Sequence, residues 1–366
     1  MYAALRPLLF ALSPHAAHAA GMAALGAIEH APPLRAALRA SLGKPDPRLA
    51  VGAMGLTFPS PIGLAGGFDK NALRPRALAA LGFGFLELGT VTAQAQAPNP
   101  APNMFRLPED RAIVNRLGFP NAGAPAVCAR IARLARSEIG VPVGVSIGKS
   151  RAVGLEPIEG ALADYVASFR EAKKVADFVV VNVSSPNTKD LRAMQGADIA
   201  RALFAEITRA NVNEGGKGRV PVLVKIAPDL SDAELEALLA VVEQAKLDGV
   251  VATNTTIARK GLKTAPARVE AIGAGGLSGP PVRARALEVV ARVRARLGAQ
   301  VTVIGVGGIE GADDVLAFVR AGADLVQMYT GFVYGGPLLP HRIARELAER
   351  MEREKVSSVE GVAARR

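Results

Sequence analysis

The sequence predicts an α/β protein, a (β/α)8 TIM barrel preceded by a small helical segment. From residue 50 onward, short apolar runs rich in β-branched residues recur, and a charged amphipathic stretch follows each one. The runs are apolar almost throughout, which is typical of parallel strands buried on both faces. Eight strand–helix units in about 300 residues match the size of this barrel, and a doubly wound open sheet is the alternative. The predicted strands are Pro61–Ala65, Phe83–Leu88, Val141–Ile147, Phe178–Val183, Val220–Ile226, Gly249–Thr253, Val301–Val306 and Asp324–Met328.

The first 42 residues differ from the rest and are expected to form two or three short helices. Residues 16–28 are mostly alanine with larger apolar residues at helical spacing, and the segment contains a single acid, Glu29. Such helices would lie on a membrane surface or cap a domain. A helical subdomain packed on the core and a cleaved secretory signal are the alternatives, although Pro14 interrupts the apolar run that a signal needs.

Helical patterns follow the eight strands. One of them begins with Ser231-Asp232-Ala-Glu234, in which a serine and a glutamate three residues later are typical of a helix start. The predicted helices are Ala72–Leu81, Ala124–Ile139, Ile158–Val175, Ile199–Asn211, Asp232–Ala245, Pro281–Leu297, Ala312–Arg320 and Leu338–Met351.

Two insertions interrupt the repeat. Between the second and third strands, Met104–Leu107 and Ala112–Asn115 are expected to pair as a small hairpin around a Pro-Glu-Asp-Arg turn. A glycine cluster, Gly273–Gly279, lies between the sixth and seventh strands.

The chain is therefore expected to have three parts. These are a helical, membrane-associating segment at 1–42, the barrel at 43–351, and a tail at 352–366. The tail is charged and lacks periodicity, so it is expected to be disordered.

Composition excludes several kinds of site. The chain has one cysteine, Cys128, and four histidines, three of them in the first 30 residues. One cysteine forms neither an intrachain disulfide nor a zinc cluster, and no metal site is expected. The sequence contains no run of 18 apolar, uncharged residues, so no membrane-spanning helix is predicted. The 44 Lys and Arg against 33 Asp and Glu give a charge of +11, which suggests nucleic acid, a membrane surface or an acidic small molecule as partner.

Polar side chains gather where the predicted strands end, which is the face of such a barrel that carries chemistry. The only acid found there is Asp69, so the paired carboxylates of a glycosidase are missing. Amides, hydroxyls, glycines and lysines make up the rest. This set suits a polar, planar, anionic ligand but supplies no strong nucleophile, and a bound redox cofactor would explain that combination.

Glycines near the ends of the last strands are candidate phosphate contacts, because bare backbone N–H groups can approach an anion closely. The candidates are Gly275, Gly276, Gly307 and Gly308, and the alternative is that they only form tight turns. Neither glycine cluster completes the dinucleotide fingerprint, so a mononucleotide such as FMN fits better.

Two lysines could face such a ligand. Lys225 ends an otherwise apolar strand, where a charge is costly unless it is paired. It could form a structural ion pair or stabilise an anionic reduced flavin, and the sequence leaves both open. Lys70 follows two glycines and could contact an anionic substrate and the cofactor together.

Eight motifs, in order along the chain, resemble those of class 2 dihydroorotate dehydrogenases. These are membrane-associated, quinone-reducing, FMN-containing enzymes of pyrimidine biosynthesis. The resemblance runs from the helical N-terminus to about residue 350. The motifs are Ala65-Gly-Gly-Phe-Asp-Lys70, Asn115-Arg-Leu-Gly-Phe119, Asn182-Val-Ser-Ser-Pro-Asn-Thr188, Lys225-Ile-Ala-Pro-Asp229, Thr253-Asn-Thr-Thr256, Gly276-Leu-Ser-Gly279, Gly305-Val-Gly-Gly-Ile309 and Tyr329-Thr-Gly331.

The resemblance implies an enzyme that oxidises (S)-dihydroorotate to orotate. The substrate hydride passes to flavin N5 while a base removes the C5 proton, and in class 2 that base is a serine of the Ser-Pro-Asn loop. Ser185 matches this position and is the implied catalytic residue. Class 1 members use a cysteine elsewhere, whereas Cys128 lies in a predicted helix.

The same resemblance implies three sets of binding residues. The substrate set is Lys70, Asn115, Arg116, Leu117, Gly118, Phe119, Asn182, Asn187, Asn254 and Thr255. The FMN set is Gly66, Gly67, Phe68, Asp69, Lys70, Thr90, Ser146, Asn182, Lys225, Thr253, Gly276, Gly308, Tyr329 and Thr330. The quinone set is His18, Arg106 and Tyr329.

Ubiquinone or another quinone would be the electron acceptor. The resemblance further implies peripheral attachment to the cytoplasmic face of the inner cell membrane, a monomer and no nucleic-acid partner. Three positions depart from the family pattern: Ser146 and Pro120 stand where asparagine is usual, and Asn103 stands where arginine is usual.

Two other functions remain as alternatives. A dihydrouridine synthase is another FMN barrel and would suit the basic charge, but it uses a catalytic cysteine and no cysteine ends a predicted strand here. A non-catalytic membrane or nucleic-acid binding protein would give no reason for Ser185, Lys225 and three asparagines to share one face.

Overall fold

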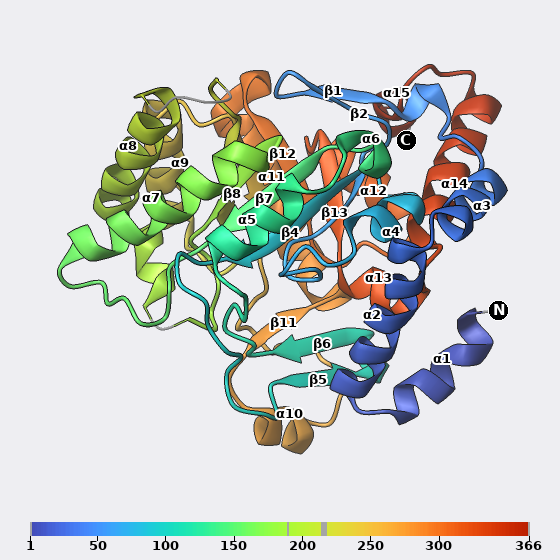
Figure 1. Cartoon of the computed structure of the whole chain (residues 1–366), viewed down its shortest axis with the longest axis horizontal. Helices are drawn as coiled ribbons and strands as arrows, with labels where there is room; N and C mark the ends of the chain where they lie inside the picture. Colours follow the sequence, from blue (N-terminus) through green and yellow to red (C-terminus); the bar gives the residue numbers. More distant parts are fainter. Residues whose placement is uncertain (1, 189, 214–217, 365–366) are drawn as a thin grey trace.

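The computed structural model describes residues 2–188, 190–213 and 218–364. Its centre is a closed barrel of eight parallel strands, which confirms the predicted (β/α)8 class over the open sheet (Figure 1). All eight predicted strands are present. They are β3 (Ile62–Leu64), β4 (Phe85–Val91), β7 (Val143–Ile147), β8 (Phe178–Asn182), β9 (Val222–Ile226), β10 (Gly249–Ala252), β12 (Thr302–Val306) and β13 (Leu325–Met328).

Helices surround the barrel and pack their apolar faces on it. The predicted helices are all found, but the one expected over 124–139 is divided in two, with Arg133–Ala135 between the halves. The helices are α4 (Pro75–Ala80), α5 (Ala124–Ala132), α6 (Arg136–Ile139), α7 (Ile158–Val175), α8 (Ala197–Asn213), α9 (Asp232–Gln244), α11 (Arg283–Leu297), α12 (Ala312–Arg320), α13 (Thr330–Gly335) and α14 (Leu339–Glu354).

A short hairpin that the sequence did not predict closes the barrel end opposite the site. Its strands β1 (Val51–Ala53) and β2 (Leu56–Phe58) pair antiparallel. The ring of Phe58 lies edge-on to Phe85 and Phe178, with centroids 5.3 and 6.4 Å apart. The barrel interior is thus a packed aromatic and aliphatic core at this end rather than a pore.

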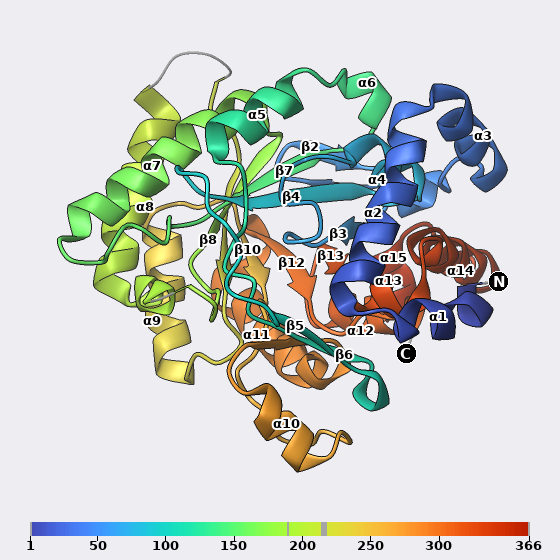
Figure 2. The ribbon, with the colours of Figure 1, turned by 60° about the horizontal axis from the view of Figure 1, so that its bottom comes forward.

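A small antiparallel sheet stands beside the other end of the barrel. The predicted hairpin is confirmed as β5 (Met104–Leu107) and β6 (Ala112–Asn115). A third strand, β11 (Gly276–Ser278), comes from the glycine cluster, which the sequence presented only as a loop. Helix α10 (Pro266–Ile272) lies beside this sheet, and its Ile272 packs against the apolar side chains of the sheet (Figure 2).

The first residues form three helices, α1 (Tyr2–Ala11), α2 (Pro14–His30) and α3 (Pro32–Leu42), as expected. Buried Glu29 joins α2 to α4, since its carboxylate accepts from Arg76 Nε and from the Ala77 N–H at 2.8 Å each. Helix α1 contacts α13, α2 contacts β5 of the small sheet, and α2 and α3 both contact α4 (Figure 2). Among the described residues, no helix is long and apolar enough to span a bilayer.

The expectation of a disordered tail is wrong for residues 352–364. Helix α14 continues to Glu354, and α15 (Val359–Ala364) packs against α12. Val359 and Val362 are buried there, and Arg320 Nε donates to the Ala363 carbonyl at 2.9 Å. Six residues are too few to show an apolar period, so no helix was predicted there.

Candidate active site

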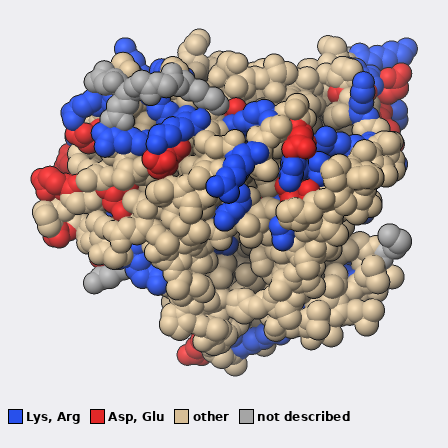
Figure 3. Space-filling view, in the orientation of Figure 1, with Lys and Arg blue, Asp and Glu red and all other residues tan. Residues whose placement is uncertain are grey.

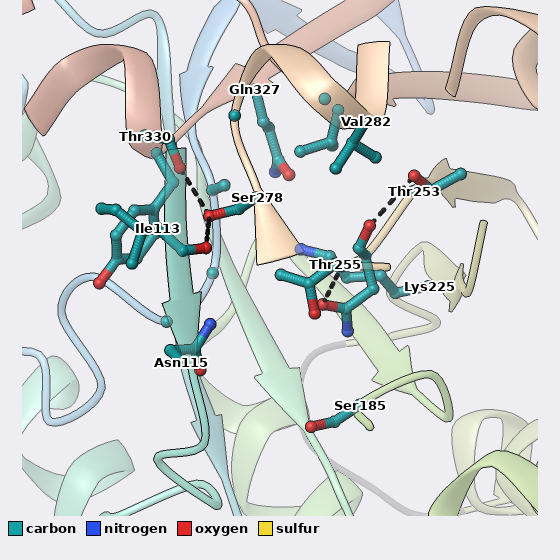
Figure 4. A pocket seen from close by; sticks show the side chains of 18 of the residues that line it. Ile113, Asn115, Ser185, Lys225, Thr253, Thr255, Ser278, Val282, Gln327 and Thr330 are labelled. Atoms are coloured by element: carbon teal, nitrogen blue, oxygen red, sulfur yellow. Dashed lines mark hydrogen bonds between the residues drawn. The ribbon is translucent and has the colours of Figure 1, made fainter. Parts of the chain in front are cut away.

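A cavity of about 1050 Å³, its mouth included, opens where the barrel strands end. Its wall is built from the loops after the strands and from the small sheet, which covers one side (Figure 4). Lys70 and Lys225 are in the lining, and the described lining residues include no Asp or Glu. This balance suits an anionic ligand. The lining also contains most of the predicted site residues: Gly66, Gly67, Thr90, Asn115, Leu117, Gly118, Phe119, Asn182, Ser185, Asn187, Thr253, Asn254, Thr255, Gly308, Tyr329 and Thr330.

Amide side chains in the lining hold one another in place. Asn187 Nδ2 donates to Asn115 Oδ1 at 3.1 Å, which connects the Ser-Pro-Asn loop to β6 of the small sheet. Asn254 Nδ2 donates to the hydroxyl of Ser184 at 2.9 Å, and Asn182 Nδ2 donates to Thr90 Oγ1 at 3.0 Å. Four amides from three separate segments therefore reach the cavity with their orientations fixed, as recognition of a planar polar ring requires.

Ser185 lies in the cavity wall and is 5 % exposed. Its Oγ accepts from the Asn187 N–H at 3.2 Å, a contact that leaves the hydroxyl proton free to point into the cavity. The nearby hydroxyl of Thr188 is buried and has no hydrogen-bond partner among the described residues. The cavity lining includes no histidine, so Ser185 is not part of a Ser-His-Asp triad.

Lys70 reaches the cavity from the loop after β3, and its ammonium group donates to the Gly67 carbonyl. Burial lowers the pKa of this lysine to about 8, although the neighbouring Asp69 opposes the shift. An anion that binds beside this lysine raises its pKa again, so the lysine becomes more fully protonated.

Lys225 forms the structural ion pair that the sequence offered as one alternative, and it also faces the cavity. Its Nζ lies 3.2 Å from Glu87 Oε1, and both side chains are buried. The same lysine lines the cavity. Glu87 also accepts from Gln327 Nε2 at 2.9 Å. A Cβ on Gly66 would lie 2.2 Å from Glu87 Oε1, so only glycine at that position leaves room for the carboxylate.

The two glycine loops meet at the far side of the cavity. Gly279 and Gly308 both have positive φ, +105° and +67°, and a Cβ on Gly308 would lie 2.9 Å from the Gly279 carbonyl oxygen. The glycines are thus needed for close loop packing, and they also leave backbone N–H groups bare at the cavity wall. Thr330 Oγ1 donates to Ser278 Oγ at 2.8 Å beside them (Figure 4).

Several predicted binding residues do not line the cavity. Asp69 accepts from the N–H groups of Leu73 and Arg74, so its carboxylate orders the turn before α4. Arg116 donates to the carbonyls of Ile272 and Ala274 in the small-sheet region. The remaining members of this group are Phe68, Ser146, Gly276, His18 and Arg106.

Three of these residues, Ser146, Gly276 and Arg106, instead contact parts of the structure around the cavity. Ser146 Oγ lies 2.9 Å from Thr90 Oγ1 and so supports a lining residue. A Cβ on Gly276 would lie 2.0 Å from Thr255 Oγ1. Arg106 donates to the carbonyls of Phe10 and Leu12 and lines a second cavity below the turn between α1 and α2.

Aromatic rings connect the cavity to helix α2. Tyr329 lines the cavity, Phe68 lies edge-on to it at 5.6 Å between centroids, and His18 lies edge-on to Phe68 at 5.7 Å. Burial, with Lys70 and His15 adding to it, lowers the pKa of His18 to about 4. The imidazole is therefore neutral at pH 7, and burial raises the pKa of Tyr329 to about 12, so the phenol is neutral as well.

Sequence reasoning missed Glu87 and Gln327, because both lie within apolar runs and not after them. A signal was present: a charged residue in the middle of an otherwise apolar strand, as in Phe85-Leu-Glu-Leu88, requires a buried partner. Cys128 is buried in α5 as expected, and burial raises its pKa to about 12. The described residues contain no group of His, Cys, Asp and Glu side chains able to hold a metal.

Comparison with known proteins decides the family. The profile of the family described as dihydroorotate dehydrogenase matches residues 48–351. The chain belongs to the dihydroorotate dehydrogenase family. A relative named dihydroorotate dehydrogenase (quinone) from Thermobifida fusca is 49 % identical over 94 % of this chain and 90 % of its own. A relative of the same name from Rhodococcus erythropolis is 48 % identical over 98 % and 97 %.

Solved structures agree with this family assignment. The crystal structure of a dihydroorotate dehydrogenase from Eimeria tenella in complex with ferulenol superposes with a TM-score of 0.82 at 34 % identity, covering 97 % of this chain and 96 % of that one. Because the quinone-named relatives match nearly end to end, this chain falls among the class 2 dihydroorotate dehydrogenases, which confirms the resemblance seen in the sequence. Membership of the family implies a flavin cofactor.

Proposed function

We propose that this protein oxidises dihydroorotate to orotate with a quinone as electron acceptor, in pyrimidine biosynthesis. The observation that carries the proposal is the position of Ser185, held in a polar cavity among fixed amides, in a chain whose quinone-named relatives match over nearly its full length. The residues at the cavity wall supply recognition and one hydroxyl for proton transfer. They supply no group able to accept a hydride, so the redox step depends on a cofactor.

FMN is the cofactor that the cavity fits. The two lysines and the bare N–H groups at Gly307 and Gly308 suit a phosphate and a polar ring edge, and no carboxylate of the described lining opposes them. The residues that would hold FMN are Gly66, Gly67, Lys70, Thr90, Asn182, Lys225, Thr253, Gly308, Tyr329 and Thr330. When bound, FMN supplies the hydride acceptor.

The chain's own residues hold the substrate and move its proton. Asn115, Asn187 and Asn254 offer both donors and acceptors to the edges of a pyrimidine ring, and Lys70 offers a cation to its carboxylate. Ser185 Oγ takes the C5 proton, which the adjacent substrate carbonyl makes acidic. Ser185 must release its own hydroxyl proton in exchange, and the unpartnered hydroxyl of Thr188, three residues along the chain, could pass that proton onward.

The quinone would approach beneath α1 and α2. Support comes from the row of rings formed by Tyr329, Phe68 and His18, which leads from the cavity to α2 and is neutral at pH 7. Arg106 lies at the turn after α1, where it donates to the carbonyls of Phe10 and Leu12. The exposed leucines of α1 suit peripheral contact with the cytoplasmic face of the membrane, and we further propose that the protein acts as a monomer.

Substitution of Ser185 by alanine tests the proton-transfer role. The variant should retain bound flavin and bind orotate, because the one hydrogen bond of the Ser185 side chain among the described residues is to the Asn187 N–H. Flavin reduction by dihydroorotate under anaerobic conditions should slow at least a hundredfold, the scale of a lost general base. Stopped-flow absorbance of the flavin gives both flavin content and rate. Unchanged reduction, or loss of the flavin itself, would contradict the assigned role.

The wild-type protein provides the test of the reaction as a whole. Anaerobic dihydroorotate should bleach the flavin absorbance, and a quinone should restore it faster than fumarate or NAD. A protein that purifies without flavin, or whose flavin dihydroorotate does not bleach, would exclude this function and favour a non-enzymatic barrel. A flavin oxidised fastest by fumarate or NAD would place the chain outside the quinone-dependent class.

A further inference from the structure

Inside the barrel, an apolar layer of side chains is followed by a polar layer on the side of the cavity. Phe85, Leu223 and Leu325 pack together inside the barrel. Side chains two positions farther along a strand point to the same side, so the next interior layer is set by the residues that follow these at a spacing of two. On these three strands, the residues of the next layer are Glu87 of β4, Lys225 of β9 and Gln327 of β13.

These three side chains form one buried polar network. Glu87 and Gln327 have no exposed surface, and Lys225 is 4 % exposed. Glu87 accepts from Lys225 Nζ at 3.2 Å and from Gln327 Nε2 at 2.9 Å. Lys225 and Gln327 also line the cavity, as the labelled side chains in Figure 4 show. Lys225 and Gln327 therefore form part of the floor of the site, and Glu87 lies beneath these two side chains.

The carboxylate determines which way the Gln327 amide faces. A carboxylate beside an ammonium group only accepts hydrogen bonds, so the NH2 end of the amide must turn toward Glu87. The carbonyl end, Oε1, then has no hydrogen-bond partner among the described residues. A buried acceptor without a partner is costly, and in a cavity wall it indicates a donor on the ligand.

We propose that Gln327 Oε1 accepts a hydrogen bond from the ring N3–H of the flavin, and that Glu87 is the positioning residue for both Gln327 and Lys225. This inference rests on the proposed FMN site. An ammonium donor and an amide acceptor held side by side complement a ring edge on which a carbonyl oxygen alternates with an N–H group. Nothing in the flavin other than N3–H donates from that edge.

Flavin exchange on the full chain tests the proposal. Wild-type protein should bind FMN at least about tenfold more tightly than 3-methyl-FMN, which lacks the N3 proton, because one buried acceptor would be left unpaired. Gln327→Ala removes the acceptor and makes room for the methyl group, so its preference for FMN should fall below about threefold. Fluorescence titration of the flavin measures both dissociation constants.

Two other variants separate positioning from general damage. Glu87→Gln keeps the shape but lets the Gln327 amide turn over, so the preference for FMN should fall between the wild-type and Gln327→Ala values. Asn211→Ala is the matched control: this buried amide pairs with the backbone of Val220 near the end of α8, outside the cavity lining, and its loss should leave the preference unchanged.

The outcomes distinguish this inference from the proposed function. If wild-type protein binds no FMN, the proposed function fails. If it binds FMN and 3-methyl-FMN equally, or if Gln327→Ala keeps the wild-type preference, the Gln327 contact is overturned while the FMN site stands. Should the Gln327 variant not fold, the N3 proton of 15N-labelled FMN bound to wild-type protein decides: slow solvent exchange supports a buried acceptor, and fast exchange excludes one.

Discussion

At the scale of single residues, the site relies on neutral donors and acceptors and on two lysines that differ in their hydrogen-bond partners. Lys225 is paired with Glu87, which keeps it beside a fixed negative charge. Among the described residues, Lys70 has no such partner at hydrogen-bonding distance, and it donates to a backbone carbonyl instead. The charge on Lys70 therefore depends on what occupies the cavity, whereas Lys225 has its counter-ion built into the barrel.

Orotate binding should consequently depend on pH through Lys70. Burial lowers the pKa of Lys70 to about 8 in the ligand-free protein, and a bound carboxylate raises it. Binding then takes up a proton above about pH 8, so the affinity for orotate falls as pH rises from 7.5 to 9.5, with a slope approaching tenfold per pH unit. Calorimetric titration in two buffers of different ionisation enthalpy measures the proton uptake directly.

Replacement by arginine provides the control for this pH dependence. The guanidinium of Lys70→Arg stays protonated across the range, so its orotate affinity should change little with pH even if the affinity itself is lower. An equally steep pH profile in the variant and the wild-type protein would assign the proton to another group.

At the scale of elements, Arg192 adds to the contact of Asn254 with Ser184 in linking the loop that carries Ser185 to the end of β10. Arg192 Nε donates to the Ser184 carbonyl at 3.3 Å, and its NH2 group donates to the Thr255 carbonyl at 3.1 Å and lies 2.9 Å from Asp229 Oδ2. Asp229 in turn accepts from Thr256 Oγ1 at 2.5 Å. The guanidinium therefore helps to set the distance between the catalytic serine and the substrate-binding residues after β10.

Arg192→Met should lower kcat about tenfold to a hundredfold while flavin content stays normal. The reason is geometric: a displacement of about 1 Å in a reacting group can cost this much, whereas Arg192 itself does not line the cavity. The exposed pair of Arg201 with Asp198 on α8 gives the control, because Arg201→Met should change neither quantity. Equal loss of flavin and turnover in Arg192→Met would show a structural role only.

At the scale of the whole molecule, the sequence predicted the barrel and most of the cavity lining, because both depend on local patterns. Parallel strands are apolar throughout and end in polar loops, so β8 and its Asn182 could be placed without a structure. Contacts across the barrel were not predictable in the same way. Glu87 and Gln327 lie 240 positions apart, and only closure of the sheet brings them together.

The same limit explains the errors at the edges of the molecule. Strand β11 has three residues, and its pairing with β6 joins positions more than 150 apart in the chain. Helix α15 is fixed by packing on α12 rather than by its own sequence. Asp69 and Arg116 belong to site motifs, yet their side chains order the backbone around the cavity and do not enter it.

The N-terminal helices expose several leucines. Leu5, Leu8 and Leu12 on and just after α1 are 49, 70 and 45 % exposed. Figure 3 shows the part of the surface over α1 and α2, at the lower right, as largely uncharged, whereas lysines and arginines gather above it. An apolar helix face beside basic residues suits the surface of a membrane that contains anionic lipid.

Leu8→Glu should therefore weaken binding to phosphatidylglycerol-containing vesicles at least tenfold, because it removes an exposed leucine that would enter the membrane and adds a charge of the wrong sign. Flavin reduction by dihydroorotate should not change, since Leu8 lies outside the cavity lining. Val212→Glu is the control: Val212 is 65 % exposed on α8, on the other side of the barrel from α1 (Figure 1). Vesicle sedimentation separates the two variants, and equal loss of binding in both would mean that net charge, not the α1 face, attaches the protein to the membrane.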